Sequence, residues 1–200
     1  MRFTAATLAL WATAALASPS ARGLYLRSAE EVKDELLPIS EMTFTGPVTV
    51  GGPDVTLQGD ASAIHEQILA LNPEYDAEDF SGPAERGLEA RQSTTTCNFG
   101  TPVERYYSQC ASAITSLLVL GTSYCSVAPA TCARVACSNS CSMYLCNNQF
   151  SGVSVYCQDI AADMGIIVSR CGVDNGNGDT RARGQLSFTG HYTYLTQQAC

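Results

Sequence analysis

Two stretches in the second half of the chain repeat one spacing of apolar positions, with successive intervals of four, three, four, three and four residues. The positions are Val103, Tyr107, Cys110, Ile114, Leu117 and Gly121 in the first stretch, and Val153, Cys157, Ile160, Met164, Ile167 and Cys171 in the second. This spacing predicts two amphipathic helices, over residues 103–121 and 153–171, each with one buried stripe. Cys110 and Cys157 are expected to point inward, and Gly172 is expected to end the second helix.

Shorter stretches in the same half predict strands. Residues 134–136 and 142–145 flank a short turn at 138–140, which is typical of a hairpin. Residues 184–195 alternate, with Gly190 as a bend. The alternation places Leu186, Phe188, Tyr192 and Tyr194 on one face and Ser187, Thr189, His191 and Thr193 on the polar face. We therefore expect a small disulfide-rich α+β domain, with two amphipathic helices packed on a small antiparallel sheet.

Residues 18–91 have a different character. Ile64, Ile68 and Leu71 are spaced for a short helix that would stop at Asn72-Pro73. Glycine and proline pairs at 46–47, 51–53 and 82–83 indicate turns around it. With no cysteine and few aromatic residues, this region is not expected to support a large core by itself.

The first 17 residues are typical of a secretory signal peptide. One basic residue precedes an apolar run from Phe3 to Leu16, and Ala15-Leu16-Ala17 supplies a cleavage site after Ala17. The run is shorter than the roughly 20 apolar residues that span a membrane. We therefore expect a secreted, extracellular protein with no stable membrane insertion.

All ten cysteines lie after residue 96, at positions Cys97, Cys110, Cys125, Cys132, Cys137, Cys141, Cys146, Cys157, Cys171 and Cys200. In a secreted chain an even number of cysteines favours disulfides over metal ligands, so we expect five disulfides and no free thiol. Each disulfide would stabilise the domain by roughly 2–4 kcal/mol. The spacing alone leaves the pairing open.

The formal charge of −8 belongs to the first half of the chain. Residues 1–91 contain fourteen acidic and six basic residues, a net of −8, whereas residues 92–200 contain five of each, a net of zero. A neutral region lacks the basic surface that nucleic acids and anionic membranes require. Neither is expected as a partner.

The cysteine and charge boundary coincides with a possible processing site. Leu88-Glu-Ala-Arg91 precedes Gln92, and a Kexin-like protease would cut after Arg91. We therefore expect a signal peptide at 1–17, an acidic propeptide at 18–91 and a cysteine-rich mature domain at 92–200. The alternative is an uncut acidic linker, because the site has a single basic residue.

Several short sequences together resemble fungal small secreted cysteine-rich proteins, many of which are described as effector candidates. They are Phe44-Thr-Gly-Pro-Val, Gly51-Gly-Pro, Gln67-Ile-Leu-Ala-Leu-Asn-Pro, Cys132-Ala-Arg-Val-Ala-Cys, Tyr144-Leu-Cys-Asn-Asn and Gly184-Gln-Leu-Ser-Phe. The order of helix, Cys171, glycine loop and last strand also resembles fungal killer toxins of the KP4 type, α/β sandwich proteins implicated in blocking calcium channels. The neutral, lysine-free region departs from basic toxins, and no functional residue is carried over.

The candidate chemistry is sparse. His191 is the only histidine after Arg91, and it lies on the polar face of the predicted strand. Asp159 and Asp163 are one helical turn apart and could serve a small glycosidase-like hydrolase, but a solvated helix face explains them better. The loop from Asp174 to Asp179 lacks the ligand spacing of a calcium loop, so no metal or cofactor is expected.

Sugar-binding modules present exposed aromatic rings, and five tyrosines of the cysteine-rich half are candidates for that role. They are Tyr106, Tyr107, Tyr144, Tyr192 and Tyr194. Most of them are expected to fill the core.

The sequence therefore favours a secreted protein that binds an extracellular or host target, a protein or a cell-wall glycan, without catalysis, and the resemblance implies that it is of the effector or toxin type. The small hydrolase using Asp159 and Asp163 is the alternative. Arg181 and Arg183 lie at the exit of the glycine-rich loop at 172–184 and are the charged residues expected to contact the target.

The secreted chain is expected to begin at Gln92, because the cysteine and charge patterns both change at Arg91. Mass spectrometry of the secreted protein tests this start. A secreted chain that still carries residues 18–91 would reject it.

Overall fold

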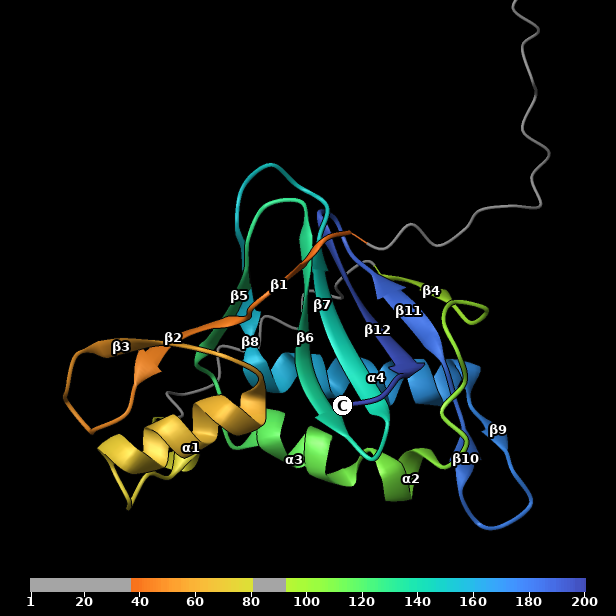
Figure 1. Ribbon diagram of the computed structural model, residues 1–200, viewed down its shortest axis with the longest axis horizontal. Coiled ribbons are helices and arrows are strands. Elements are labelled where there is room, and N and C mark those ends of the chain that lie inside the picture. The colour runs from red at the N-terminus through yellow and green to blue at the C-terminus, as the bar shows by residue number, and fades with distance from the viewer. Residues whose placement is uncertain (1–36, 81–92) are drawn as a thin grey trace, which may run out of the picture. The chain divides into compact units, whose positions relative to one another are not determined.

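Two main β-sheets and a short two-stranded sheet, β9 and β10, organise the chain, which a computed structural model describes for residues 37–80 and 93–200 (Figure 1). The strands are β1 (Ile39–Ser40), β2 (Thr43–Pro47), β3 (Asp54–Gln58), β4 (Thr94–Thr96), β5 (Tyr124–Val127), β6 (Thr131–Ser138), β7 (Cys141–Asn147), β8 (Val153–Tyr156), β9 (Val173–Asp174), β10 (Thr180–Arg181), β11 (Gly184–Ser187) and β12 (His191–Gln197). The helices are α1 (Ala61–Leu71), α2 (Tyr106–Gln109), α3 (Ala111–Leu118) and α4 (Cys157–Cys171), with a 3-10 turn at Ala77–Phe80.

The larger sheet has six strands in the order β1-β6-β7-β12-β11-β4. Its strands pair antiparallel except for β1, which runs parallel to β6. The predicted hairpin at residues 134–145 is confirmed as β6 and β7, joined at Asn139 and Ser140, both of which have positive φ. The hairpin forms the middle of the sheet together with β12.

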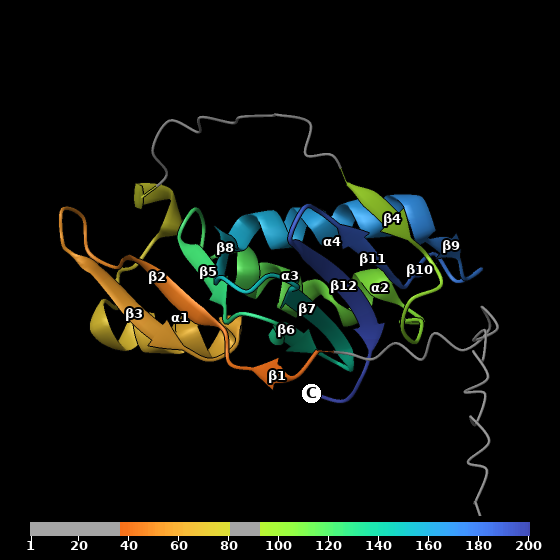
Figure 2. The ribbon, with the colours of Figure 1, turned by 90° about the horizontal axis from the view of Figure 1, so that it is seen from above.

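Helices α3 and α4 lie against one face of this sheet (Figure 2). The apolar face of α4 is fully buried through Ile160, Met164 and Ile167, and α3 contributes Leu117. They pack with Met143, Leu145, Leu186 and Leu195 of the sheet in one hydrophobic core. Burial of these side chains is the main force that holds the helices to the sheet.

A second, smaller cluster covers the opposite face. Tyr144 and Tyr194 stack with ring centroids 4.5 Å apart, and the edge of Phe99 meets Tyr194 at 5.0 Å. The Cys132–Cys146 disulfide lies in the same cluster. The expectation that most of the candidate tyrosines fill the core is confirmed for Tyr106, Tyr144 and Tyr194, which are all buried.

The smaller sheet has four strands in the order β3-β2-β5-β8. Strands β2 and β3 come from the cysteine-free half of the chain, whereas β5 and β8 come from the cysteine-rich half. Phe44 on β2 is opposite Cys125 on β5, and both are fully buried. The sheet therefore joins the two halves of the sequence in one core.

The cysteine-free half contains the helix predicted at residues 60–71, which α1 confirms. Asp60 caps it by accepting a hydrogen bond from the Ala63 amide at 3.0 Å, and Ile64 and Ile68 are fully buried. The three strands were not predicted. Gly46, interpreted as part of a turn, lies inside β2, where a side chain would collide with Ser123 at 2.3 Å. Glycine at this position permits the close approach of the backbone to Ser123.

The two predicted helices of the cysteine-rich half begin later than expected. Residues 103–121 form two short helices, α2 and α3, and Tyr107 is 61% exposed while its neighbour Tyr106 is buried. Residues 153–156 form β8, because they pair with β5. The helix α4 ends at Gly172 as predicted.

The ten cysteines form five disulfides and leave no free thiol, as predicted. The pairs are Cys97–Cys171, Cys110–Cys141, Cys125–Cys157, Cys132–Cys146 and Cys137–Cys200. Cys110 and Cys157 are both fully buried, as expected, but Cys110 lies between α2 and α3 and Cys157 is the first residue of α4. The protein is thus a disulfide-rich α+β fold, but its sheets are larger and more numerous than the two helices on one small sheet that were predicted.

Part of the predicted organisation lies outside the described residues. The signal peptide with Ala17, and the junction between Arg91 and Gln92, both fall there and stay predictions. Within residues 37–80 and 93–200, no helix is long and apolar enough to cross a membrane.

Replacing Phe44 by alanine should lower the free energy of unfolding of the full chain by about 3–5 kcal/mol, because the ring fills a fully buried site. Chemical unfolding followed by tyrosine fluorescence measures this change. Val50→Ala is the control, since Val50 is 70% exposed and its truncation should change stability by less than about 0.5 kcal/mol. Equal effects of the two substitutions would show that β2 is not part of the core.

Candidate functional site

The loop between β7 and β8, residues 148–152, is fixed by the buried side chain of Asn147. Its amide nitrogen donates to the carbonyl oxygens of Ser151 at 2.7 Å and Ala128 at 3.1 Å. Its amide oxygen accepts a hydrogen bond from the Gln149 backbone at 2.9 Å. One buried side chain thus ties this loop to itself and to the end of β5, so the loop is held in one conformation.

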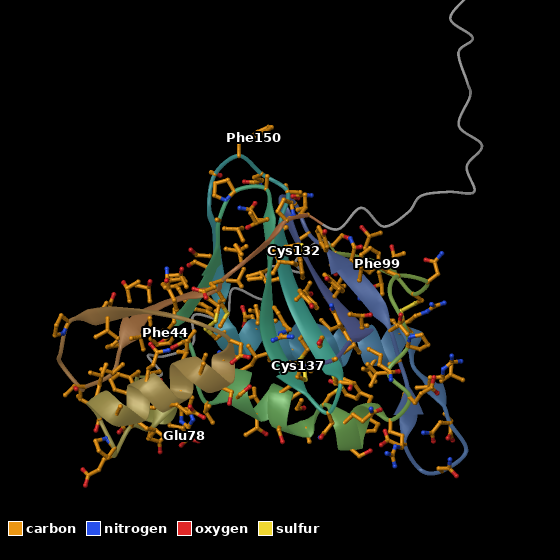
Figure 3. The ribbon with its side chains drawn as sticks, in the orientation of Figure 1. Phe44, Glu78, Phe99, Cys132, Cys137 and Phe150 are labelled. Atoms are coloured by element: carbon orange, nitrogen blue, oxygen red, sulfur yellow. A yellow bond between two sulfur atoms is a disulfide. The ribbon has the colours of Figure 1, made fainter. Side chains whose placement is uncertain are left out.

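Phe150 projects from this loop and is 99% exposed (Figure 3). The residue before it is held on two sides: the Ala130 amide donates to the Gln149 carbonyl at 3.0 Å, and the Gln149 side chain packs against Gly190. Gly190 has a positive φ, in the region that favours glycine, so a side chain there would strain the backbone. A large apolar ring is therefore presented to solvent by a rigid support, which is typical of a contact residue in binding.

A groove of about 450 Å³ lies between the smaller sheet, at β5 and β8, and the turn that joins β11 and β12. We call it the aromatic groove, and its lining residues are Tyr124, Ser154, Val155, Tyr156, Phe188, Thr189 and His191. Its volume is within the range of about 300–1,000 Å³ that is usual for ligand pockets. None of these seven residues is a lysine, arginine, aspartate or glutamate.

Two tyrosines form one wall of the aromatic groove. Tyr124 on β5 is directly opposite Tyr156 on β8, and their rings stack with centroids 5.0 Å apart. They are 45% and 38% exposed, because the pleat turns Cys125 and Val155 inward and these tyrosines outward. A flat aromatic surface results on the outer face of the smaller sheet.

The turn between β11 and β12 forms the other wall. The rings of Phe188 and His191 stack with centroids 4.8 Å apart, and the Phe188 amide donates to the His191 carbonyl at 2.9 Å. Gly190 closes the turn with a φ of +89° and accepts a hydrogen bond from the Asn148 amide. The turn that forms this wall is therefore hydrogen-bonded to the loop that carries Phe150.

A second groove, of about 380 Å³, lies between α2, α3, α4 and the β9–β10 hairpin. The hairpin is anchored by Asp179, whose carboxylate accepts hydrogen bonds from the Tyr107 amide at 2.8 Å, the Ser108 amide at 3.1 Å and the Ser108 hydroxyl at 2.5 Å. Asp179 thus caps the start of α2, although it is about 70 residues away in the sequence. The Thr180 amide adds a fourth hydrogen bond at 2.7 Å.

These hydrogen bonds set the ionisation of Asp179. Its desolvation acts to raise the pKa, but the hydrogen bonds from Ser108, Thr180 and Tyr107 outweigh it and lower the pKa to about 2. The carboxylate is thus engaged within the protein. Within the described part of the chain, no three side chains gather in the way a metal site requires.

Arg181 and Arg183, the residues expected to contact the target, lie at the exit of this hairpin. The Arg181 guanidinium donates to the Glu104 carboxylate at 3.0 Å, and both side chains are about half exposed, at 52% and 56%. Arg183 donates to the Gly100 carbonyl at 2.7 Å. Between them, Ala182 is buried and pairs with Val103. Neither arginine lines the aromatic groove.

The structure corrects the expected placement of Asp163. It is 5% exposed and accepts a hydrogen bond from the Thr193 hydroxyl at 3.2 Å, so it does not lie on a solvated helix face. Asp159 is half-buried. The reason is that α4 is buried against the sheet over a wider face than its apolar stripe. Neither aspartate lines either of the two grooves.

The expected faces of the last strand are also wrong. Leu186 on β11 is directly opposite Thr193 on β12, so both point to the helices, and His191 shares that side. Tyr192 and Tyr194 point to the opposite face. The tight turn at 188–190 shifts the alternation by one position, and a single-residue shift moves every following side chain to the other face.

No protein-family model, curated protein or solved structure matches this chain.

Asp179 should make the stability of the protein depend on acid. Because its folded pKa of about 2 is below the ordinary value of 3.8, its contribution is present above pH 4 and is lost as the pH falls toward 2. Asp179→Asn should remove this part of the pH dependence. Guanidinium unfolding at pH 5 and pH 2 measures it.

Asp174→Asn in the same hairpin is the control, because Asp174 accepts a hydrogen bond only from the Gly176 amide among the contacts described here. The Asp174→Asn protein should lose as much stability between pH 5 and pH 2 as the unsubstituted protein does. If Asp179→Asn loses as much stability between pH 5 and pH 2 as the unsubstituted protein does, the hydrogen bonds to Asp179 do not depress its pKa.

Proposed function

We propose that this is a secreted protein, of the effector or toxin type, that binds a target outside the cell through the aromatic groove and Phe150 without chemical turnover. The observation that carries the proposal is the gathering of aromatic rings on one rigid surface. Tyr124, Tyr156, Phe188 and His191 line the groove, and Phe150 projects from the loop that is hydrogen-bonded to the turn at Gly190.

The chemistry of the groove suits a neutral glycan. Tyrosine faces offer flat apolar surfaces for the C–H faces of sugar rings, while the hydroxyls of Tyr124, Tyr156, Ser154 and Thr189 can exchange hydrogen bonds with sugar hydroxyls. No lysine, arginine or carboxylate side chain lines the groove, so a highly charged ligand would lose its hydration without compensation. An uncharged cell-wall polysaccharide is therefore the target class that we favour over a protein.

The disulfides support a binding function. Cys125–Cys157 connects β5, next to Tyr124, with the first residue of α4, next to Tyr156. This link holds the two tyrosine strands together outside the cell, where proteases and changing conditions act on the protein. Because this wall of the aromatic groove is already held in its binding geometry, it loses little conformational entropy when a ligand binds.

Phe150→Ala and the double substitution Tyr124→Ala with Tyr156→Ala should each weaken binding to insoluble neutral glycans by about tenfold or more, because exposed aromatic anchors contribute more than about 1.4 kcal/mol each. Co-sedimentation with chitin, β-glucan and cellulose measures the affinity. Tyr107→Ala is the matched control, since Tyr107 is 61% exposed but lies at the second groove. It should leave binding unchanged.

Arg181→Ala tests the predicted arginine contact in the same assay. Arg181 is chosen over Arg183 because Arg183 also donates a hydrogen bond to the Gly100 carbonyl, which its replacement would remove. Loss of binding in Arg181→Ala but not in Phe150→Ala would move the site to the hairpin.

If the protein instead hydrolyses one of these glycans and Asp159→Asn removes the activity, it is the alternative hydrolase. Binding only to a host or cell-surface protein would contradict the glycan assignment.

A further inference from the structure

The cysteine-free segment 38–80 pairs with both sheets of the cysteine-rich part. At the larger sheet, β1 extends β6: the Cys132 amide donates to the Pro38 carbonyl at 2.9 Å, and the hydroxyls of Ser40 and Thr131 are 2.9 Å apart. At the smaller sheet, β2 lies between β3 and β5. Without the segment, β5 and β6 would each have an unpaired edge.

The same segment contributes fully buried side chains to the main core. Met42, Phe44, Ile64 and Ile68 are at most 1% exposed, and they belong to one cluster with Leu117 and Val135 of the cysteine-rich part. The helix α1 packs against α3. Release of the segment would expose both sides of this contact to water, which the hydrophobic effect opposes.

No covalent bond other than the chain itself joins the segment to the cysteine-rich part. All five disulfides lie between Cys97 and Cys200. Residues 37–80 contain eight acidic residues and no lysine or arginine, whereas residues 93–200 have no net charge. Strand pairing and apolar burial, not charge attraction, must therefore hold the segment.

We propose that residues 38–80 stay bound after the chain is cut at Arg91, so that the processed protein consists of two non-covalently associated chains. The N-terminal chain is then a permanent partner, which pairs with the edge of β5 and covers the apolar surface of α3. This inference rests on the predicted cut but not on what the aromatic groove binds.

The purified full chain, cut after Arg91 by a Kexin-type protease, tests the proposal. A denaturing gel should show two fragments, and gel filtration at micromolar concentration should show both in one peak. The peak should persist in 1 M sodium chloride, because salt screens charges but does not weaken apolar burial. Elution of the two fragments in separate peaks in low salt would overturn the proposal.

Matched substitutions on α1 test whether the described contacts hold the fragment. Ile68 is fully buried and Leu71 is 58% exposed, so each is replaced by alanine before the cut, and thiol titration checks that all disulfides have formed. Exchange of the bound fragment for an isotope-labelled copy gives its release rate by native mass spectrometry. Ile68→Ala should release about 30-fold faster or more, and Leu71→Ala should release at the unsubstituted rate. Equal release rates for the two variants would contradict the proposed interface.

Discussion

The antiparallel pairing of β2 with β5 is the interaction on which the rest of the structure depends. Phe44 on β2 lies opposite Cys125 on β5, and Cys125 is bonded to Cys157, the first residue of α4. Contacts therefore run without a break from the cysteine-free half of the chain, through the smaller sheet, to the helix that covers the larger sheet. Packed side chains and one disulfide thus connect β2 with α4.

The two faces of the smaller sheet separate the hydrophobic core from the proposed binding surface. On the inner face, Phe44, Cys125 and Val155 join the core, while on the outer face Tyr124 and Tyr156 line the aromatic groove. The alternation of strand side chains makes this division unavoidable once the register is fixed. Since Thr45 on β2 is opposite Tyr124, the cysteine-free segment also borders the wall of the groove. The scaffold and the proposed site thus share the same strands.

The sequence predicted those features that depend on local patterns. The helix α1, the end of α4 at Gly172, the β6–β7 hairpin and complete disulfide bonding all follow from spacing along the chain. Features that depend on long-range pairing were missed. Val153 to Tyr156 fit a helical stripe but form β8, because β5 is available as a partner. Gly46-Pro47 suggested a turn but end a strand, because Ser123 needs a neighbour without a side chain.

The candidate site was hidden for the same reason. Tyr124 and Tyr156 become a pair only when β5 and β8 align, and Phe188 and His191 join them only through the turn at Gly190. The buried position of Asp163 required knowledge of how α4 meets β12. Phe150 left one signal in the sequence, a single large apolar residue between Asn147-Asn-Gln and Ser151-Gly, which are polar or small.

Hydrogen–deuterium exchange of the uncut protein tests the β2–β5 pairing most directly. If β2 is an inner strand of a stable sheet, peptides that cover residues 43–47 should be protected as strongly as peptides that cover β7, at residues 141–147. Exchange of the β2 amides at the rate of an unfolded chain, with β7 still protected, would show that the cysteine-free segment is not part of the folded core.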